Sequence, residues 1–128
     1  NSGGANDALA YCFAEVEGYS KIGKYTGNTN ADGDFVYTGF RPAWVMIKVA
    51  GVAGYGWYIF DAVRSEFNTI DKALFPNSTG AEYTPVPIDF LSNGFKLRTT
   101  DGGVNNGSYS PYIYMAFAEV PFKYALGR

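Results

Sequence analysis

The sequence contains no histidine and only one cysteine, Cys12, in 128 residues. The missing imidazole removes the usual general base near neutral pH, the Ser–His and Cys–His nucleophile systems and the commonest zinc ligand. One cysteine excludes an internal disulfide and leaves too few soft ligands for a transition-metal site. Because Cys12 lies in the apolar run 10–13, we expect a buried, unreactive thiol.

Charge and long apolar runs are also scarce. The 10 basic and 12 acidic residues give a net charge of −2, and no basic stripe is present to bind phosphates. No apolar run approaches the ~20 residues of a membrane-spanning helix. Residues 1–6 have neither the basic head nor the apolar stretch of a signal peptide. We therefore expect no nucleic-acid partner and no membrane span.

Apolar, aromatic and glycine residues are abundant. Hydrophobic residues make up 47% of the chain and aromatic residues 18%, and 16 glycines supply turns, so an all-β fold is favoured. Apolar–polar alternation predicts an antiparallel β-sandwich, or a jelly-roll-like arrangement of it, and Asn93-Gly94 marks its clearest hairpin. The expected strands are residues 8–16, 35–38, 43–49, 57–62, 88–91, 95–98 and 111–119.

A short repeat links the two ends of the chain. Phe13-Ala14-Glu15-Val16 recurs as Phe117-Ala118-Glu119-Val120, and flanking residues agree in the same register. This similarity favours a true internal repeat. The chain then divides into residues 1–24, a repeat or strand-exchange arm, and residues 25–128, the sandwich module. Such an arm can pair beside its twin or add a strand to a neighbouring chain.

The terminal strands are therefore the predicted assembly elements. Most of their candidate contact residues are aromatic, the class of residue that interfaces favour. The set comprises Tyr11, Phe13, Val16, Tyr112, Tyr114, Phe117 and Val120.

Other patterns suggest ligand sites. Tyr55 and Tyr58 flank a glycine-rich turn and Tyr109 lines the last strand, and exposed rings of this kind contact glycans or partner proteins. The loop 28–34 has oxygen side chains at alternate positions and a glycine sixth, so Asp32 and Asp34 are weak calcium candidates. That loop lacks the acidic first and twelfth ligands of a calcium-binding hand, and an Asx-rich turn explains the same residues.

Paired carboxylates open one enzymatic alternative. Glu15 and Glu119 are equivalent in the repeat, and two carboxylates suffice for glycoside hydrolysis. A repeated carboxylate is more simply a structural or interface feature. We therefore expect no enzymatic activity, no cofactor and no bound metal.

Several stretches resemble a β-rich module of unknown molecular function found in bacteriophage tail and virion proteins. The resemblance is carried by residues 37–48, by Trp57 to Arg64, by the hairpin 89–98 and by the ending 115–124. It covers nearly the whole chain from Tyr19 onward. It implies a virion or extracellular location, in a tail or fibre protein, and it brings no catalytic residues.

The leading hypothesis is a virion structural protein that acts by assembly, with copies of itself or with other virion proteins. Two alternatives remain open. One is a receptor- or glycan-binding module at a tail-fibre tip, and the other is an extracellular filament subunit.

Overall fold

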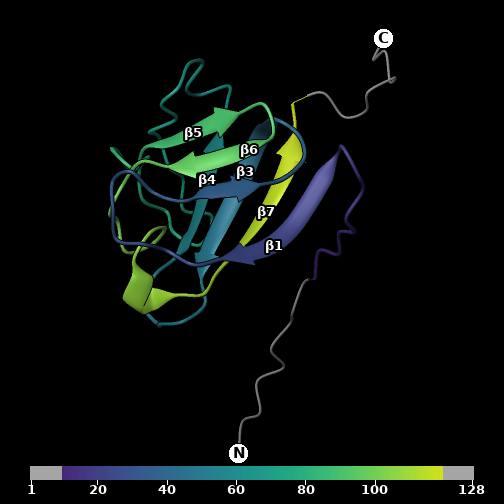
Figure 1. Ribbon diagram of the computed structural model, residues 1–128. Helices are drawn as coiled ribbons and strands as arrows, with labels where there is room; N and C mark the ends of the chain where they lie inside the picture. Colours follow the sequence, from purple (N-terminus) through teal and green to yellow (C-terminus); the bar gives the residue numbers. More distant parts are fainter. Residues whose placement is uncertain (1–9, 120–128) are drawn as a thin grey trace, which may run out of the picture.

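In this computed structural model, which describes residues 10–119, seven strands form two layers (Figure 1). The strands are β1 (Ser20–Tyr25), β2 (Phe35–Tyr37), β3 (Pro42–Val49), β4 (Trp57–Asp61), β5 (Ile88–Leu91), β6 (Gly94–Leu97) and β7 (Tyr112–Ala118). One 3-10 turn, η1 (Gly107–Tyr109), precedes β7.

The strands pair only in antiparallel fashion, in two sheets. The larger sheet has the order β1-β7-β3-β4 and the smaller has the order β2-β6-β5. The expectation of an all-β, antiparallel sandwich is confirmed. Strand β3, whose sequence is apolar on both faces, is an interior strand between β7 and β4.

The core lies between the two sheets. Alternate residues of the larger sheet point inward in register, as in the row Gly23–Tyr114–Ile47–Tyr58. Phe95 of the smaller sheet meets Tyr114 edge to face, at 5.4 Å between ring centroids. Gly23 provides room for this packing, because a Cβ there would lie 2.8 Å from the Tyr114 hydroxyl.

The prediction that residues 8–16 form the first strand is wrong. Residues 10–15 are irregular and exposed, and Val16 makes one antiparallel bridge with Ser20. The first strand is β1, which begins at Ser20, four residues after Val16. The expected boundary between residues 24 and 25 falls inside this strand, so residues 20–24 are part of the sandwich.

The environment of Cys12 is also different from the expected one. Its side chain is exposed, because the segment around it does not enter a sheet. Among the described residues, no helix has the length and apolarity needed to cross a membrane.

A fully buried amide closes the loop at residues 28–34. Asn105 accepts a hydrogen bond from the Asn28 backbone N–H at 2.8 Å, and its Nδ2 donates to the carbonyls of Asn30 and Thr99, each at 2.8 Å. Sequence patterns did not single out Asn105. Its role becomes visible only when the loop and residue 105 come together in the fold.

Candidate functional site

The larger sheet has a second, outward-facing side that is also mostly apolar. We call it the outer face and define it by the residues opposite to the core-facing ones. Its twelve residues are Ser20, Ile22, Lys24, Trp44, Met46, Lys48, Trp57, Ile59, Asp61, Ile113, Met115 and Phe117.

The strand register arranges these residues in three rows that cross all four strands in the order β1-β7-β3-β4. The first row is Ser20–Phe117–Trp44–Asp61, the middle row is Ile22–Met115–Met46–Ile59, and the third row is Lys24–Ile113–Lys48–Trp57. The middle row is apolar from edge to edge. A solvated sheet face usually carries polar residues, so this pattern is typical of a face that binds another surface.

The apolar residues of this face are accessible. Ile22 and Ile113 are exposed, while Met46, Met115 and Trp57 are half-buried by their neighbours. A hollow of about 90 Å³ lies among these five side chains and Tyr114. The whole chain contains two methionines, and both belong to the middle row. Such flexible, polarisable side chains suit an adaptable contact surface.

One corner of the outer face is covered by the segment 10–16, which we call the arm. Phe13 lies edge to face on Phe117, at 5.6 Å between centroids, and Tyr19 contacts the same ring at 5.8 Å. Ser20 belongs to the outer face by register but is buried, and its Oγ donates to the Ala14 carbonyl at 2.8 Å.

Beyond the single backbone bridge between Val16 and Ser20, side chains hold the arm to β1. The Glu15 carboxylate accepts from the Ile22 N–H at 3.1 Å and pairs with the Lys21 ammonium at 3.2 Å. These two contacts, in that order, lower the pKa of the Glu15 carboxyl. A general acid of glycoside hydrolysis needs a raised pKa, which is the opposite direction. Glu119, which is equivalent to Glu15 in the repeat, forms an ion pair with Arg41 at 2.9 Å.

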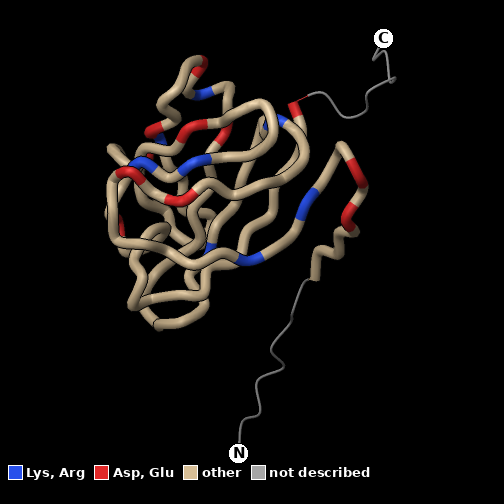
Figure 2. Tube along the Cα trace, in the orientation of Figure 1, with Lys and Arg blue, Asp and Glu red and all other residues tan. Residues whose placement is uncertain are grey.

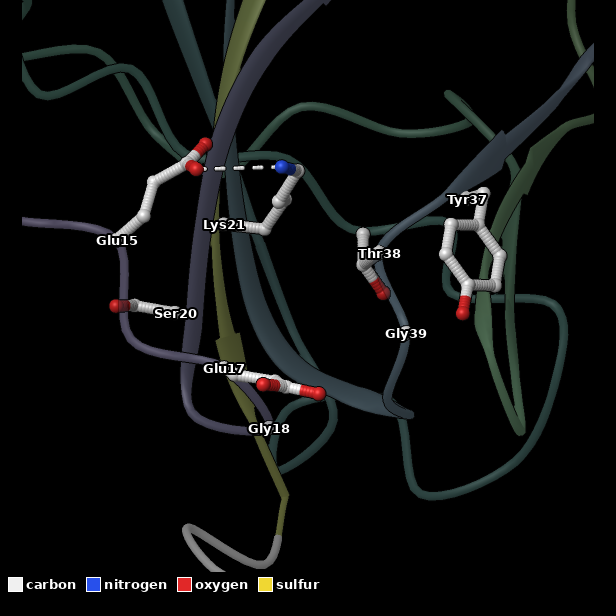
Figure 3. A pocket seen from close by; sticks show the side chains of 8 residues that line it. All are labelled: Glu15, Glu17, Gly18, Ser20, Lys21, Tyr37, Thr38 and Gly39. Carbon is white, nitrogen blue, oxygen red and sulfur yellow. Dashed lines mark hydrogen bonds and ion pairs between the residues drawn. The ribbon is translucent and has the colours of Figure 1, made fainter.

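A polar cleft of about 420 Å³ lies between this part of the chain and the end of β2 (Figure 3). The segment with Glu15, Glu17 and Lys21 forms one wall, and Tyr37, Thr38 and Gly39 form the other. The Glu15–Lys21 ion pair neutralises itself, and Thr38 Oγ1 donates to the Phe40 carbonyl at 2.7 Å. Glu17 and the exposed Tyr37 ring are the remaining groups able to contact a ligand.

Two of the predicted assembly residues are core residues. Tyr112 and Tyr114 are buried, because β7 turns them toward the smaller sheet. Phe117, on the opposite side of β7, does lie on the outer face. Tyr11 is 77% exposed, Phe13 and Val16 are exposed on the arm, and Val120 lies outside the described residues.

The predicted aromatic ligand site does not form as expected. Tyr58 is only 6% exposed, and its ring packs edge to face on Phe75 at 4.8 Å between centroids, so this residue belongs to the core. Burial and the neighbouring Asp101 carboxylate raise the pKa of its hydroxyl. Tyr55 and Tyr109 are half-buried and contact one another at 5.5 Å.

The calcium candidates make internal contacts. Asp32 pairs with Lys96 at 2.7 Å and with Arg98 at 3.3 Å, and Asp34 accepts from the Asn28 amide at 3.1 Å. Within residues 10–119, no three acidic, cysteine or histidine side chains gather in a group that could hold a metal ion. Acidic and basic positions are interspersed along the trace (Figure 2).

Fold and site together define a small antiparallel β-sandwich with an apolar outer face. The chain belongs to the family described as "Domain of unknown function (DUF7483)", whose pattern matches residues 1–121. A search of curated proteins and a search of solved structures each find no match. The family match includes the arm as well as the sandwich.

Proposed function

We propose that this chain is a structural module of a bacteriophage virion, and that it acts by protein–protein assembly through its outer face. The observation that carries the proposal is the apolar middle row, Ile22–Met115–Met46–Ile59, which crosses the whole sheet. The resemblance to modules of phage tail proteins supports the setting.

The composition of the outer face supports a contact with protein more than one with a sugar. Its aromatic residues, Trp44, Trp57 and Phe117, lie on a face whose middle row consists of methionine and isoleucine, and the single carboxylate among its twelve residues, Asp61, is paired with Arg64. Tryptophan and methionine are enriched where proteins bind one another. A glycan-binding role remains the second candidate, and the cleft beside Tyr37 and Glu17 is the feature that favours it.

Oxidation of the two methionines tests the proposal directly, because Met46 and Met115 both report on the outer face. Particles of the virus that encodes the chain are purified, treated with hydrogen peroxide and analysed by peptide mass spectrometry. We expect the chain to be present in the particles. Both methionines should be oxidised at least about tenfold more slowly there than in the dilute free chain, which corresponds to roughly 1.4 kcal/mol of protection.

A radical footprint of Tyr37 provides the control, since this exposed side chain belongs to β2 of the smaller sheet, outside the outer face, and is expected to react equally in both samples. Absence of the chain from the particles contradicts the virion assignment. Equal oxidation of both methionines in the particle and in the free chain contradicts assembly through the outer face.

A further inference from the structure

The two ends of the outer face differ in shape. On β7 and β1, the first row is raised, because Phe13 and Tyr19 lie on Phe117. The hollow of about 90 Å³ lies over the middle and third rows, and is lined by Ile22, Met46 and Met115 of the middle row and by Ile113 and Trp57 of the third. The projection therefore lies at the first-row end of β1 and β7, and the hollow extends from the middle row to the third-row end of the same face.

The two ends also differ in charge. The third row holds two ammonium groups, Lys24 and Lys48. The first row holds Asp61, which forms a cluster with Arg64 and Glu82 whose formal charge is negative. Lys48 Nζ donates to the Tyr55 carbonyl at 2.5 Å, which leaves the apolar stem of this side chain along the face.

Two copies can stack face to face around a twofold axis in two ways. With the axis parallel to the strands, each row lies over the same row of the other copy, and the four lysines gather at one end. With the axis along the middle row, the third row of one copy lies over the first row of the other. The projection then enters the hollow, and the lysines are separated.

The second arrangement also improves the individual contacts. The apolar stem of Lys48 lies over the Trp44 ring of the other copy. Trp57 lies over Asp61, and Met46 and Met115 each meet their own counterparts on the axis. Antiparallel sheets stacked in this way keep the aligned geometry of natural sandwiches. Both shape and charge select the same axis.

We infer that the partner of the outer face is the outer face of a second copy of this chain, related by a twofold axis along the middle row. This inference rests on the proposed function and names the partner for it. Four strands and three rows span about 19 by 20 Å, or roughly 400 Å² per copy. A single contact of that size is weak, so it suits a site repeated many times in a particle.

Crosslinking of single cysteines tests the axis. In a Cys12→Ser background, Met46→Cys, Lys48→Cys and Trp44→Cys are prepared in the full chain. Each variant alone, and an equal mixture of the last two, is treated with a short bismaleimide whose reach suits the ~10 Å spacing of packed sheets. Circular dichroism first establishes that each variant is folded.

The twofold axis predicts a specific pattern. Met46→Cys links to itself, because it lies on the axis. Neither Lys48→Cys nor Trp44→Cys links to itself, since two copies of either residue are displaced by ~13 Å along the strands as well as by the sheet spacing. Their mixture does link, with a lower yield than Met46→Cys because contacts between two copies of the same variant cannot link, and adding Ile22→Asp abolishes both products.

Any other pattern overturns the inference. Self-linking of Lys48→Cys assigns the axis parallel to the strands, and no linking at all removes the second copy as the partner. If the methionines are nevertheless protected in virus particles, the proposed function stands and the partner is a different protein. If they are unprotected there, the proposed function fails independently of the crosslinks.

Discussion

The two copies of Phe-Ala-Glu have different structures in one chain. Residues 117 and 118 lie in β7, which pairs with β1 on one side and β3 on the other. Residues 13–15 lie in the arm, beside the outer edge of β1, and form no strand. Since the local sequences agree, the neighbours of each segment decide the difference. Residues 117 and 118 have a partner strand on each side, whereas residues 13–15 have none.

Two side chains stop the arm from extending the sheet. The bridge between Val16 and Ser20 begins an antiparallel ladder, with backbone bonds of 2.9 and 3.2 Å. Ser20 Oγ then donates to the Ala14 carbonyl, and Glu15 takes the Ile22 N–H. Such side-chain bonds compete with strand pairing. A charged residue at a sheet edge also discourages further strand addition.

The largest expected contrast compares equivalent positions of the repeat, Ala116 and Cys12. Ala116 is fully buried, so Ala116→Asp places an unpaired carboxylate in the core. We expect it to cost more than about 4 kcal/mol, which removes most of the ~5–15 kcal/mol that stabilise a typical domain. Cys12 is exposed, and Cys12→Asp is expected to change stability by less than about 0.5 kcal/mol.

Urea unfolding followed by circular dichroism measures both variants. Equal losses of stability at the two positions would show that the arm is as deeply packed as β7. Ala116→Asn serves as the control, since a neutral side chain of nearly the same size as aspartate separates the effect of charge from that of size.

An intermediate contrast compares the two phenylalanines. Phe117 contacts Phe13, Tyr19 and Trp44, so we expect Phe117→Ala to cost about 2 kcal/mol. Phe13 is exposed on its other side, and Phe13→Ala is expected to cost about 1 kcal/mol or less. A double-mutant cycle should give a coupling of ~0.5–1 kcal/mol between the rings. Additive losses would show that the arm does not lie on β7.

Most of the sandwich is predictable from sequence, because its strands are separated by strong turn residues. Asn93-Gly94 predicts the hairpin of β5 and β6, and apolar residues on both faces predict that β3 is interior. The sequence-based prediction does not include β1, because Lys21, Gly23 and Lys24 weaken the alternation of apolar and polar residues in this strand. The ring contacts between β1 and β7 join one tyrosine of β1, Tyr25, to two tyrosines of β7, Tyr112 and Tyr114.

The outer face could not be predicted, because alternation does not say which face of a strand is the core. In β7, both the set Tyr112 and Tyr114 and the set Ile113 and Met115 are apolar. The sequence-based hypothesis placed the tyrosines at an interface, yet their hydroxyl groups find partners within the fold, such as the Gly102 carbonyl for Tyr112 at 2.8 Å. The methionine row depends on register across four strands, which sequence alone does not reveal.

The smallest expected contrast concerns the arm carboxylate and pH. The Ile22 N–H, and then Lys21, hold the pKa of Glu15 below its ordinary value in the folded chain. A group whose folded pKa is depressed favours folding at pH values above its unfolded pKa, and this contribution disappears as pH falls through the folded pKa. Glu15 is solvent-exposed, so its effect on stability is small and its titration is the sensitive measurement.

Carbon-13 NMR of the glutamate carboxyl groups follows this titration. The Glu15 midpoint should lie below that of glutamate in an unfolded peptide of the same sequence. Lys21→Met should move the midpoint only part of the way back, because the larger cause, the bond from the Ile22 N–H, remains. An ordinary midpoint in the native chain would mean that Glu15 does not hold the β1 edge. The two copies of Phe-Ala-Glu would then differ for a reason other than the side chains that interrupt the ladder.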